Sequence, residues 1–167
     1  SGLSRAEVDQ ETLDFYANEF NEAIASTKPN PRADQVVKLL KEHGVKVYLA
    51  TNPIFPRAGT MNRIRWAGID AEDFEVITTY ETYHYCKPNP KYFQEVMEEF
   101  RLNPKECLMV GNDVQEDLTI RSLGVKTYLL TDTLENKKNI PLEEAETEYK
   151  GTMEELYEWF QSYFVHN

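Results

Sequence analysis

Short apolar segments alternate with longer segments of helical periodicity along this chain of 167 residues, and this alternation restricts the folds it can adopt. Compact segments of strand character lie at residues 45–50, 74–78, 107–110 and 125–130. Between them, apolar residues recur at the spacing of an amphipathic helix, for example over residues 57–66. Strands separated by helices of about 10–15 residues are typical of βαβ units, so the sequence predicts an α/β fold with a parallel sheet.

The predicted helices carry recognisable start and stop signals. Asn30 and Asn89 each precede a proline, which is the pattern of an N-cap residue followed by proline at the first helical position. Gly44 and Gly124 each follow a helical segment, where glycine commonly ends a helix. We therefore predict helices that begin directly after the two asparagines and helices that end at the two glycines.

The two ends of the chain give further predictions. We predict one continuous helix over residues 5–27 and a polar, acid-rich surface loop over residues 132–150. Thr152 and Glu155 form a T-x-x-E capping box, which predicts the start of a final helix. The apolar face of the first helix is expected to consist of Leu13, Tyr16, Ala17, Phe20 and Ile24.

Composition excludes several classes of protein. The chain carries 18 Lys and Arg against 29 Asp and Glu, a net charge of -11, which disfavours binding to duplex nucleic acid or to an anionic membrane. No apolar run approaches the roughly 18 residues of a membrane span, and no signal peptide opens the sequence. The two cysteines are too few for a disulfide scaffold. We therefore expect a cytoplasmic protein with free thiols.

Polar residues follow the predicted strands, at the edge of a parallel sheet where functional groups gather. Thr51 and Asn52 follow the first strand, and a hydroxyl beside turn N–H groups there can hold a phosphate oxygen. The same Thr-Asn-Pro string is also compatible with an ordinary turn. Lys87 lies within the rigid sequence CKPNP, which suits a point charge aimed at an anion, although an isolated lysine is often only solvated.

The string GNDVQED, residues 111–117, follows the third predicted strand. Asp113 and Asp117 are four residues apart and so share one helical face. Carboxylate oxygens beside the Asn112 amide are hard ligands that suit Mg²⁺. Asp113 could equally cap a helix, with Asp117 favoured by the helix dipole. The two interpretations are compatible with each other.

In this order and spacing, the three strings resemble the haloacid dehalogenase superfamily, in its phosphatase-like branch. YLATNP resembles its second motif with Thr51, CKPNPKYF its third with Lys87, and VGNDVQED its fourth with Asp113 and Asp117. The resemblance covers roughly residues 31–130.

The resemblance implies a fold and a division of the chain. It implies a three-layer, Rossmann-like α/β core with a parallel sheet over residues 31–167. Residues 1–30 would be the remnant of a helical cap or a linker leading out of it.

The resemblance also implies Mg²⁺-dependent hydrolysis of a phosphomonoester by way of an aspartyl nucleophile. Thr51 and Lys87 would act in catalysis, and Asn52 would help them to bind the transferring phosphoryl group. A small phosphorylated metabolite is the expected substrate.

The fourth motif would hold the metal. Asp113 would ligate Mg²⁺, while Asn112 and Asp117 would support the site from outside the ligand set, with Asp117 orienting Lys87 or the waters of the metal.

The family's first motif, an apolar strand ending in D-x-D-x-T, has no counterpart in this sequence. The nearest string, residues 9–13, lies within the predicted first helix and has no strand character before it. In the family this strand carries the nucleophile and lies centrally, between the strands predicted at 45–50 and 107–110. Unpaired groups in a buried sheet cost about 1–3 kcal/mol each, so we expect a truncated fragment that is inactive alone.

The sequence leaves open how the gap is filled. The missing strand could belong to a longer parent, be supplied by the protein's own N-terminal fragment or another protomer, or be replaced by a rearranged sheet. A non-catalytic phosphate-binding or interaction domain with the same fold is the alternative function. A two-component receiver domain is disfavoured because its carboxylates come first in the chain, and a Rossmann binder because no G-x-G-x-x-G follows a strand.

Overall fold

The computed structural model describes residues 4–166, so the first three residues of the predicted segment 1–30 lie outside it. The chain divides into two compact units: unit 1, Ser1–Thr82, and unit 2, Tyr83–Asn167. Among the described residues, no helix has both the length and the apolar character needed to cross a membrane.

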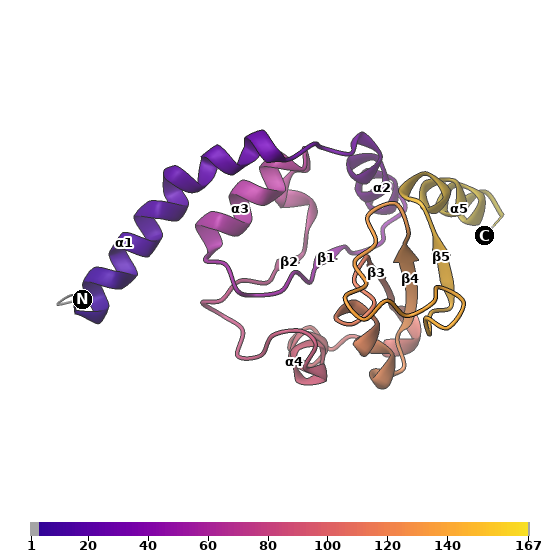
Figure 1. Cartoon of the computed structure of the whole chain (residues 1–167). Coiled ribbons are helices and arrows are strands. Elements are labelled where there is room, and N and C mark those ends of the chain that lie inside the picture. Colours follow the sequence, from indigo (N-terminus) through magenta and orange to yellow (C-terminus); the bar gives the residue numbers. More distant parts are fainter. Residues whose placement is uncertain (1–3, 167) are drawn as a thin grey trace. The chain divides into compact units, whose positions relative to one another are not determined.

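Unit 1 is mainly helical and contains one small parallel sheet (Figure 1). Strands β1 (Tyr48–Leu49) and β2 (Val76–Ile77) pair in parallel, with Tyr48 opposite Val76 and Leu49 opposite Ile77. Both strands are shorter than the segments 45–50 and 74–78 that the sequence predicts. The helical elements are α1 (Arg5–Ala17), η1 (Glu19–Ser26), α2 (Pro31–Glu42), α3 (Arg57–Trp66) and η2 (Ala71–Asp73).

The prediction of one helix over residues 5–27 is wrong, because the α-helix is interrupted at Asn18. Its backbone has φ -118° and ψ -84°, and α1 gives way to the 3₁₀ helix η1. The Asn18 side chain donates to the carbonyl oxygen of Asp14 at 2.9 Å, a local bond of the kind that competes with a continuing helix. Leu13 and Ile24, predicted on the apolar face, are 38% and 51% exposed.

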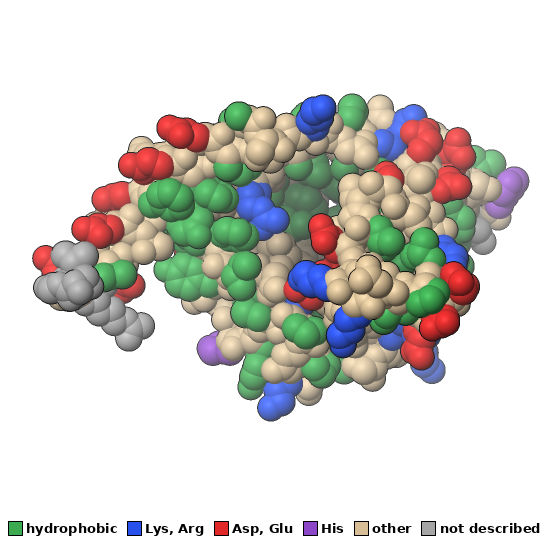
Figure 2. Space-filling model, in the orientation of Figure 1, with side chains coloured by type: hydrophobic (Ala, Val, Ile, Leu, Met, Phe, Trp, Pro, Cys, Tyr) green, Lys and Arg blue, Asp and Glu red, His purple; other side chains and the backbone are tan. Residues whose placement is uncertain are grey.

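The break in the helix allows an aromatic cluster to form around α3. Phe20 has its ring centroid 4.9 Å from that of Tyr16, 5.8 Å from that of Phe55 and 5.1 Å from that of Trp66. A Cβ on Gly59 would lie 2.7 Å from the Tyr16 ring, so only glycine permits this close approach of α1 to α3. In Figure 2, acidic side chains lie along α1 and hydrophobic side chains gather beside it.

Unit 2 is built on a three-stranded parallel sheet, which confirms the predicted parallel pairing. The strand order is β3-β4-β5, and Leu108 of β3 lies opposite Lys126 of β4. Figure 1 shows these strands side by side, with α5 following β5. The elements are α4 (Pro90–Glu99), η3 (Pro104–Glu106), β3 (Leu108–Gly111), η4 (Asp117–Leu123), β4 (Lys126–Leu130), β5 (Tyr149–Gly151) and α5 (Met153–His166).

The predicted helix signals are confirmed. The side chains of Asn30 and Asn89 each accept from the backbone N–H two residues further on, at 3.0 and 3.1 Å. Gly44 and Gly124 adopt the left-handed conformation, with φ of 74° and 85°. The predicted capping box at the start of α5 also forms, with both reciprocal hydrogen bonds present.

The segment between β4 and β5 differs from the predicted loop over residues 132–150. It ends in strand β5, whose sequence Tyr-Lys-Gly has too little apolar character to indicate a strand. Its hydrophobic side chains pack against the buried residues Val114, Leu118 and Leu129. We call Thr131–Glu148 the strap, because it covers part of the core of unit 2. The strap residues in that contact are Leu134, Ile140, Leu142 and Ala145.

Glu148 ties the end of the strap to β4 and gives a pH-dependent prediction. One carboxylate oxygen accepts from the backbone N–H of buried Thr127 at 2.8 Å, and the other pairs with Arg121 at 3.0 Å. Burial raises the pKa of Glu148, but these bonds outweigh it and lower the pKa to about 2. The carboxylate therefore stabilises the fold fully above about pH 4.5, and this contribution is lost as the pH falls towards 2.

We expect Glu148→Gln to reduce the free energy of unfolding by about 1 kcal/mol at pH 6, a value limited by the partial exposure of the ion pair. The difference from the unsubstituted chain should shrink steadily as the pH is lowered to 3. Urea denaturation at several pH values measures it, and a difference that does not change with pH would contradict the assignment.

Candidate active site

Thr51 and Asn52 lie in unit 1, in the turn that follows β1. The hydroxyl of Thr78 donates to the Thr51 carbonyl oxygen at 2.6 Å, and the Asn52 carbonyl oxygen accepts from the Ile54 N–H at 2.8 Å. Thr78 is fully buried, so its hydrogen bond anchors the backbone of the turn to the interior of unit 1. Thr78 is not among the predicted site residues, and its only signal in the sequence is its place as the last residue of the predicted strand 74–78.

Lys87 and Asp117 form a buried ion pair in unit 2. The Lys87 Nζ lies 2.6 Å from Asp117 Oδ1, and the two side chains are only 7% and 8% exposed. The ammonium group also lies 5.9 Å from the ring centroid of Tyr92 and 5.4 Å from that of Phe93, so aromatic faces surround part of it. The lysine is therefore held in one place, unlike a solvated surface lysine.

Asp117 also joins the lysine to the loop that follows β3. Its Oδ2 accepts from the backbone N–H groups of Asn112 at 2.9 Å and Asp113 at 3.0 Å. A Cβ on Gly111 would lie 2.3 Å from the same oxygen, so the absence of a side chain at Gly111 permits this approach. One carboxylate thus fixes both the buried cation and the backbone at the end of β3.

The carboxylate of Asp113 fixes a turn rather than the start of a helix, because the next helix, η4, begins only at Asp117 and has no side-chain cap. Its Oδ1 accepts from the N–H groups of Gln115 and Glu116, both at 2.8 Å, which fixes the orientation of the carboxylate. The residue itself is 8% exposed. Its Oδ2 lies 3.5 Å from the Nζ of Lys137 in the strap. The helix predicted to end at Gly124 is the short 3₁₀ helix η4 rather than an α-helix.

A divalent cation bound at Asp113 would have few ligands from the protein. No group of three or more His, Cys, Asp or Glu side chains arranged for a metal occurs in the described part of the chain. Asp113 nevertheless offers one hard oxygen, Oδ2, whose partner oxygen is held by backbone donors. Mg²⁺ commonly binds through one or two carboxylates and keeps several waters. The donor chemistry therefore fits Mg²⁺ with Asp113 as a single ligand.

Four of the predicted site residues come together in unit 2: Lys87, Asn112, Asp113 and Asp117. Asn112 uses its side-chain amide to donate to the Thr133 carbonyl oxygen at 2.7 Å, which connects the loop to the strap. The other two predicted residues, Thr51 and Asn52, belong to unit 1.

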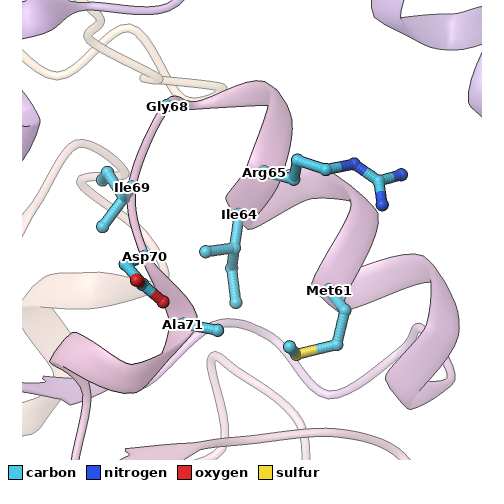
Figure 3. A pocket seen from close by; sticks show the side chains of 7 residues that line it. All are labelled: Met61, Ile64, Arg65, Gly68, Ile69, Asp70 and Ala71. Carbon is cyan, nitrogen blue, oxygen red and sulfur yellow. The ribbon is translucent and has the colours of Figure 1, made fainter.

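A pocket in unit 1 contains none of the predicted site residues. It has a volume of about 440 Å³ and lies between the end of α3 and the start of η2. Figure 3 shows Ile64, Ile69 and Ala71 along it, with Arg65 directed away from the pocket centre. Its lining is mainly apolar, with Arg65 and Asp70 as the charged residues, and the guanidinium of Arg65 donates to the side chains of Asn21 and Asn62.

The family of the chain follows from a match over most of its length. A family model described as haloacid dehalogenase-like hydrolase matches residues 2–124. The chain belongs to this family. The match includes each of the strings that hold Thr51, Lys87 and Asp113, and it agrees with the resemblance noted in the sequence.

Curated relatives of this chain include phosphatases. It is 29% identical over 119 residues to a bifunctional riboflavin kinase/FMN phosphatase of Arabidopsis thaliana, a match that covers 71% of the chain and 31% of the relative. It is 32% identical over 96 residues to the pyrophosphatase PpaX of Halalkalibacterium halodurans, a match that covers 58% of the chain and 43% of the relative. The chain thus spans less than half the length of these two relatives.

Solved structures of haloacid dehalogenase-like proteins share the fold. A predicted phosphoglycolate phosphatase from Haemophilus somnus 129pt has a TM-score of 0.70 at 22% identity, covering 94% of this chain and 68% of that one. A HAD phosphatase from Thermococcus onnurineus has a TM-score of 0.67 at 20% identity, covering 86% and 63%. The α/β fold with parallel strands is therefore that of the family.

Proposed function

We propose that this chain provides the phosphate-binding and metal-binding parts of a Mg²⁺-dependent phosphomonoesterase, whose aspartyl nucleophile lies outside these 167 residues. The observation that carries the proposal is the buried Lys87–Asp117 pair beside Asp113 at the end of β3. A small phosphorylated metabolite is the proposed substrate, in keeping with relatives named for FMN and pyrophosphate.

Lys87 is proposed to neutralise negative charge on the phosphoryl oxygens and on the nucleophile. A lysine used in this way must be placed before the substrate arrives, since phosphoryl transfer depends on positioning and charge stabilisation. The 2.6 Å bond to Asp117 and the two aromatic rings provide that placement. Asp117 is accordingly a positioning residue in this proposal.

Thr51 is proposed to donate its hydroxyl to a phosphoryl oxygen, with the Asn52 backbone assisting. The support from unit 1 is local: buried Thr78 holds the carbonyl group of Thr51 and so fixes the turn. A fixed turn after a parallel strand is a common place for anion binding.

Asp113 is proposed to ligate Mg²⁺ through Oδ2, in keeping with the general use of Mg²⁺ by hydrolases of this family. When bound, the ion would neutralise charge on the phosphoryl group. The hydrogen bonds from Gln115 and Glu116 to Oδ1 would hold the carboxylate in one orientation and leave Oδ2 for the ion. Asn112 supports the same loop through its bond to Thr133.

Open strand edges support a nucleophile strand beyond this chain. Within the described residues, β1 has β2 as its one strand neighbour and β3 has only β4. The apolar residues Leu108, Met109 and Val110 of β3 are only half-buried, whereas most of β4 is buried. A parent chain, a separate N-terminal fragment or a second protomer could each supply the missing strand.

We expect the 167-residue chain to release no phosphate from p-nitrophenyl phosphate with Mg²⁺. A longer protein that carries the nucleophile strand should release phosphate under the same conditions. The substitution Asp113→Asn should lower the kcat of that longer protein by about 100-fold or more. Intact mass under denaturing conditions, compared with the native mass, shows which form is assayed. A mass well above 19.5 kDa, or a co-purifying peptide, would reveal the completing strand.

Mg²⁺-dependent turnover by the 167-residue chain, abolished by Lys87→Ala, would overturn the proposal that the nucleophile lies elsewhere. Saturable phosphate or Mg²⁺ binding without turnover in the longer protein would instead favour a non-catalytic phosphate-binding domain.

A further inference from the structure

The strap is attached to the loop that carries Asp113 by several hydrogen bonds. The Glu135 N–H donates to the Asn112 carbonyl oxygen at 2.8 Å, and the Val114 N–H donates to the Glu135 carbonyl oxygen at 3.0 Å. The Gln115 side chain adds a bond to Asn136 at 3.1 Å. These bonds lie on both sides of Asp113, so the strap is held in place beside its carboxylate.

Lys137 comes directly after the bonded residues of the strap, and its ammonium group lies near the Asp113 carboxylate. Its Nζ lies 3.2 Å from Glu116 Oε1 and 3.5 Å from Asp113 Oδ2. The preceding Asn136 is anchored, because its side chain both donates to and accepts from the backbone of Ile140. The carboxylates of Glu116 and Asp113 raise the pKa of Lys137, so it remains charged at neutral pH.

Lys137 faces Oδ2 of Asp113, which is the oxygen of that carboxylate that is available to bind a metal ion. Oδ1 of Asp113 is occupied by backbone N–H groups, whereas Oδ2 faces the ammonium group. We propose that Lys137 is a built-in counter-ion for Asp113, which a divalent cation must displace in order to bind. This inference rests on the proposed metal-binding role of Asp113.

The geometry makes such a displacement easy. The Lys137 side chain is 65% exposed, so it can move into solvent, and its shorter contact is with Glu116 rather than Asp113. Exposed ion pairs are weak, so the competition should change metal affinity only a few-fold. Lys137 would thereby stabilise the metal-free loop and weaken the site for Mg²⁺.

The matched control is Lys138, the next residue along the strap. It has the same charge and forms no ion pair within the part of the chain that the structure describes. Lys137→Met and Lys138→Met therefore change the net charge equally, and only the first removes the contact with Asp113.

The experiment measures Mn²⁺ binding to the 167-residue chain by the electron paramagnetic resonance signal of free Mn²⁺, with Mg²⁺ as competitor, at about 0.15 M salt. We expect Lys137→Met to lower the dissociation constants of both ions roughly two- to fivefold, and Lys138→Met to change them less than about 1.5-fold. Equal effects of the two substitutions would overturn the inference.

A separate outcome identifies failure of the proposed metal site itself. If Asp113→Asn binds Mn²⁺ as tightly as the unsubstituted chain, Asp113 is not a ligand, and the role of Lys137 falls with it. If instead Asp113→Asn loses Mn²⁺ binding while the two lysine variants bind with equal affinity, the inference about Lys137 fails and the role of Asp113 as a ligand stands.

Discussion

Lys87→Met is expected to lower the free energy of unfolding by about 3–5 kcal/mol, the largest effect we anticipate for a single charged residue. The substitution leaves the Asp117 carboxylate, 8% exposed, without its cation. Removing one partner of a buried pair is far more costly than the pair is worth, because the remaining charge stays desolvated. Urea denaturation followed by far-UV circular dichroism measures the loss.

A double substitution separates the ion pair from simple packing. Asp117→Asn removes the negative charge but keeps an acceptor oxygen for the N–H groups of Asn112 and Asp113. The chain with both Lys87→Met and Asp117→Asn should therefore recover at least half of the stability lost in Lys87→Met alone. Lys91→Met on α4, where the lysine is exposed, serves as the matched control and should cost less than about 0.5 kcal/mol.

Additive losses in the double variant would contradict a coupled pair. In that case Lys87 would stabilise the fold mainly through its contacts with the rings of Tyr92 and Phe93. The same comparison bears on function, because a lysine that is not fixed by Asp117 could not be placed in advance for a phosphoryl group.

Much of the fold could be predicted because its signals are local. Asn30 and Asn89 cap helices through bonds to residues two positions away, and Gly124 ends η4 through its own left-handed backbone. Lys87 and Asp113 stand out in the sequence because each lies in a loop that follows a predicted parallel strand, where functional groups commonly gather. Helix caps and strand-end loops are set mainly by residues close to them in the sequence.

What the sequence did not predict depends on contacts between distant segments. Beside the break at Asn18, Tyr16 packs against the ring of Phe55 and Phe20 against that of Trp66, and both partners are far away in the chain. β5 forms because β4 offers it a backbone edge, although its own sequence is a weak strand former. Lys137 lies in a polar segment that resembles a solvated loop, and only the bonds of the strap bring it to Asp113.

Gly111→Ala is expected to lower the free energy of unfolding by about 3 kcal/mol and to disturb the contacts that Asp117 makes with the other site residues. The new Cβ would lie 2.5 Å from the Cβ and Cγ of Asp117 and 2.3 Å from its Oδ2. Because the Cβ of Asp117 keeps its position when the side chain changes rotamer, such a change cannot relieve the overlap. Asp117 would have to move away from Lys87 and from the N–H groups of Asn112 and Asp113.

Gly44→Ala distinguishes this steric effect from the general cost of replacing a glycine. Gly44 has φ 74°, but no atom lies within 4 Å of the place that an added methyl group would take, so its substitution carries only the backbone strain of about 1 kcal/mol. Gly111 is not among the glycines with positive φ in the described chain, so its cost should arise from Asp117 alone. In a chain with Lys87→Met and Asp117→Gly, Gly111→Ala should therefore cost less than about 1 kcal/mol. Thermal and urea denaturation compare the two backgrounds, and an equal cost in both would show that Gly111 is needed for the backbone of β3 rather than for the approach of Asp117.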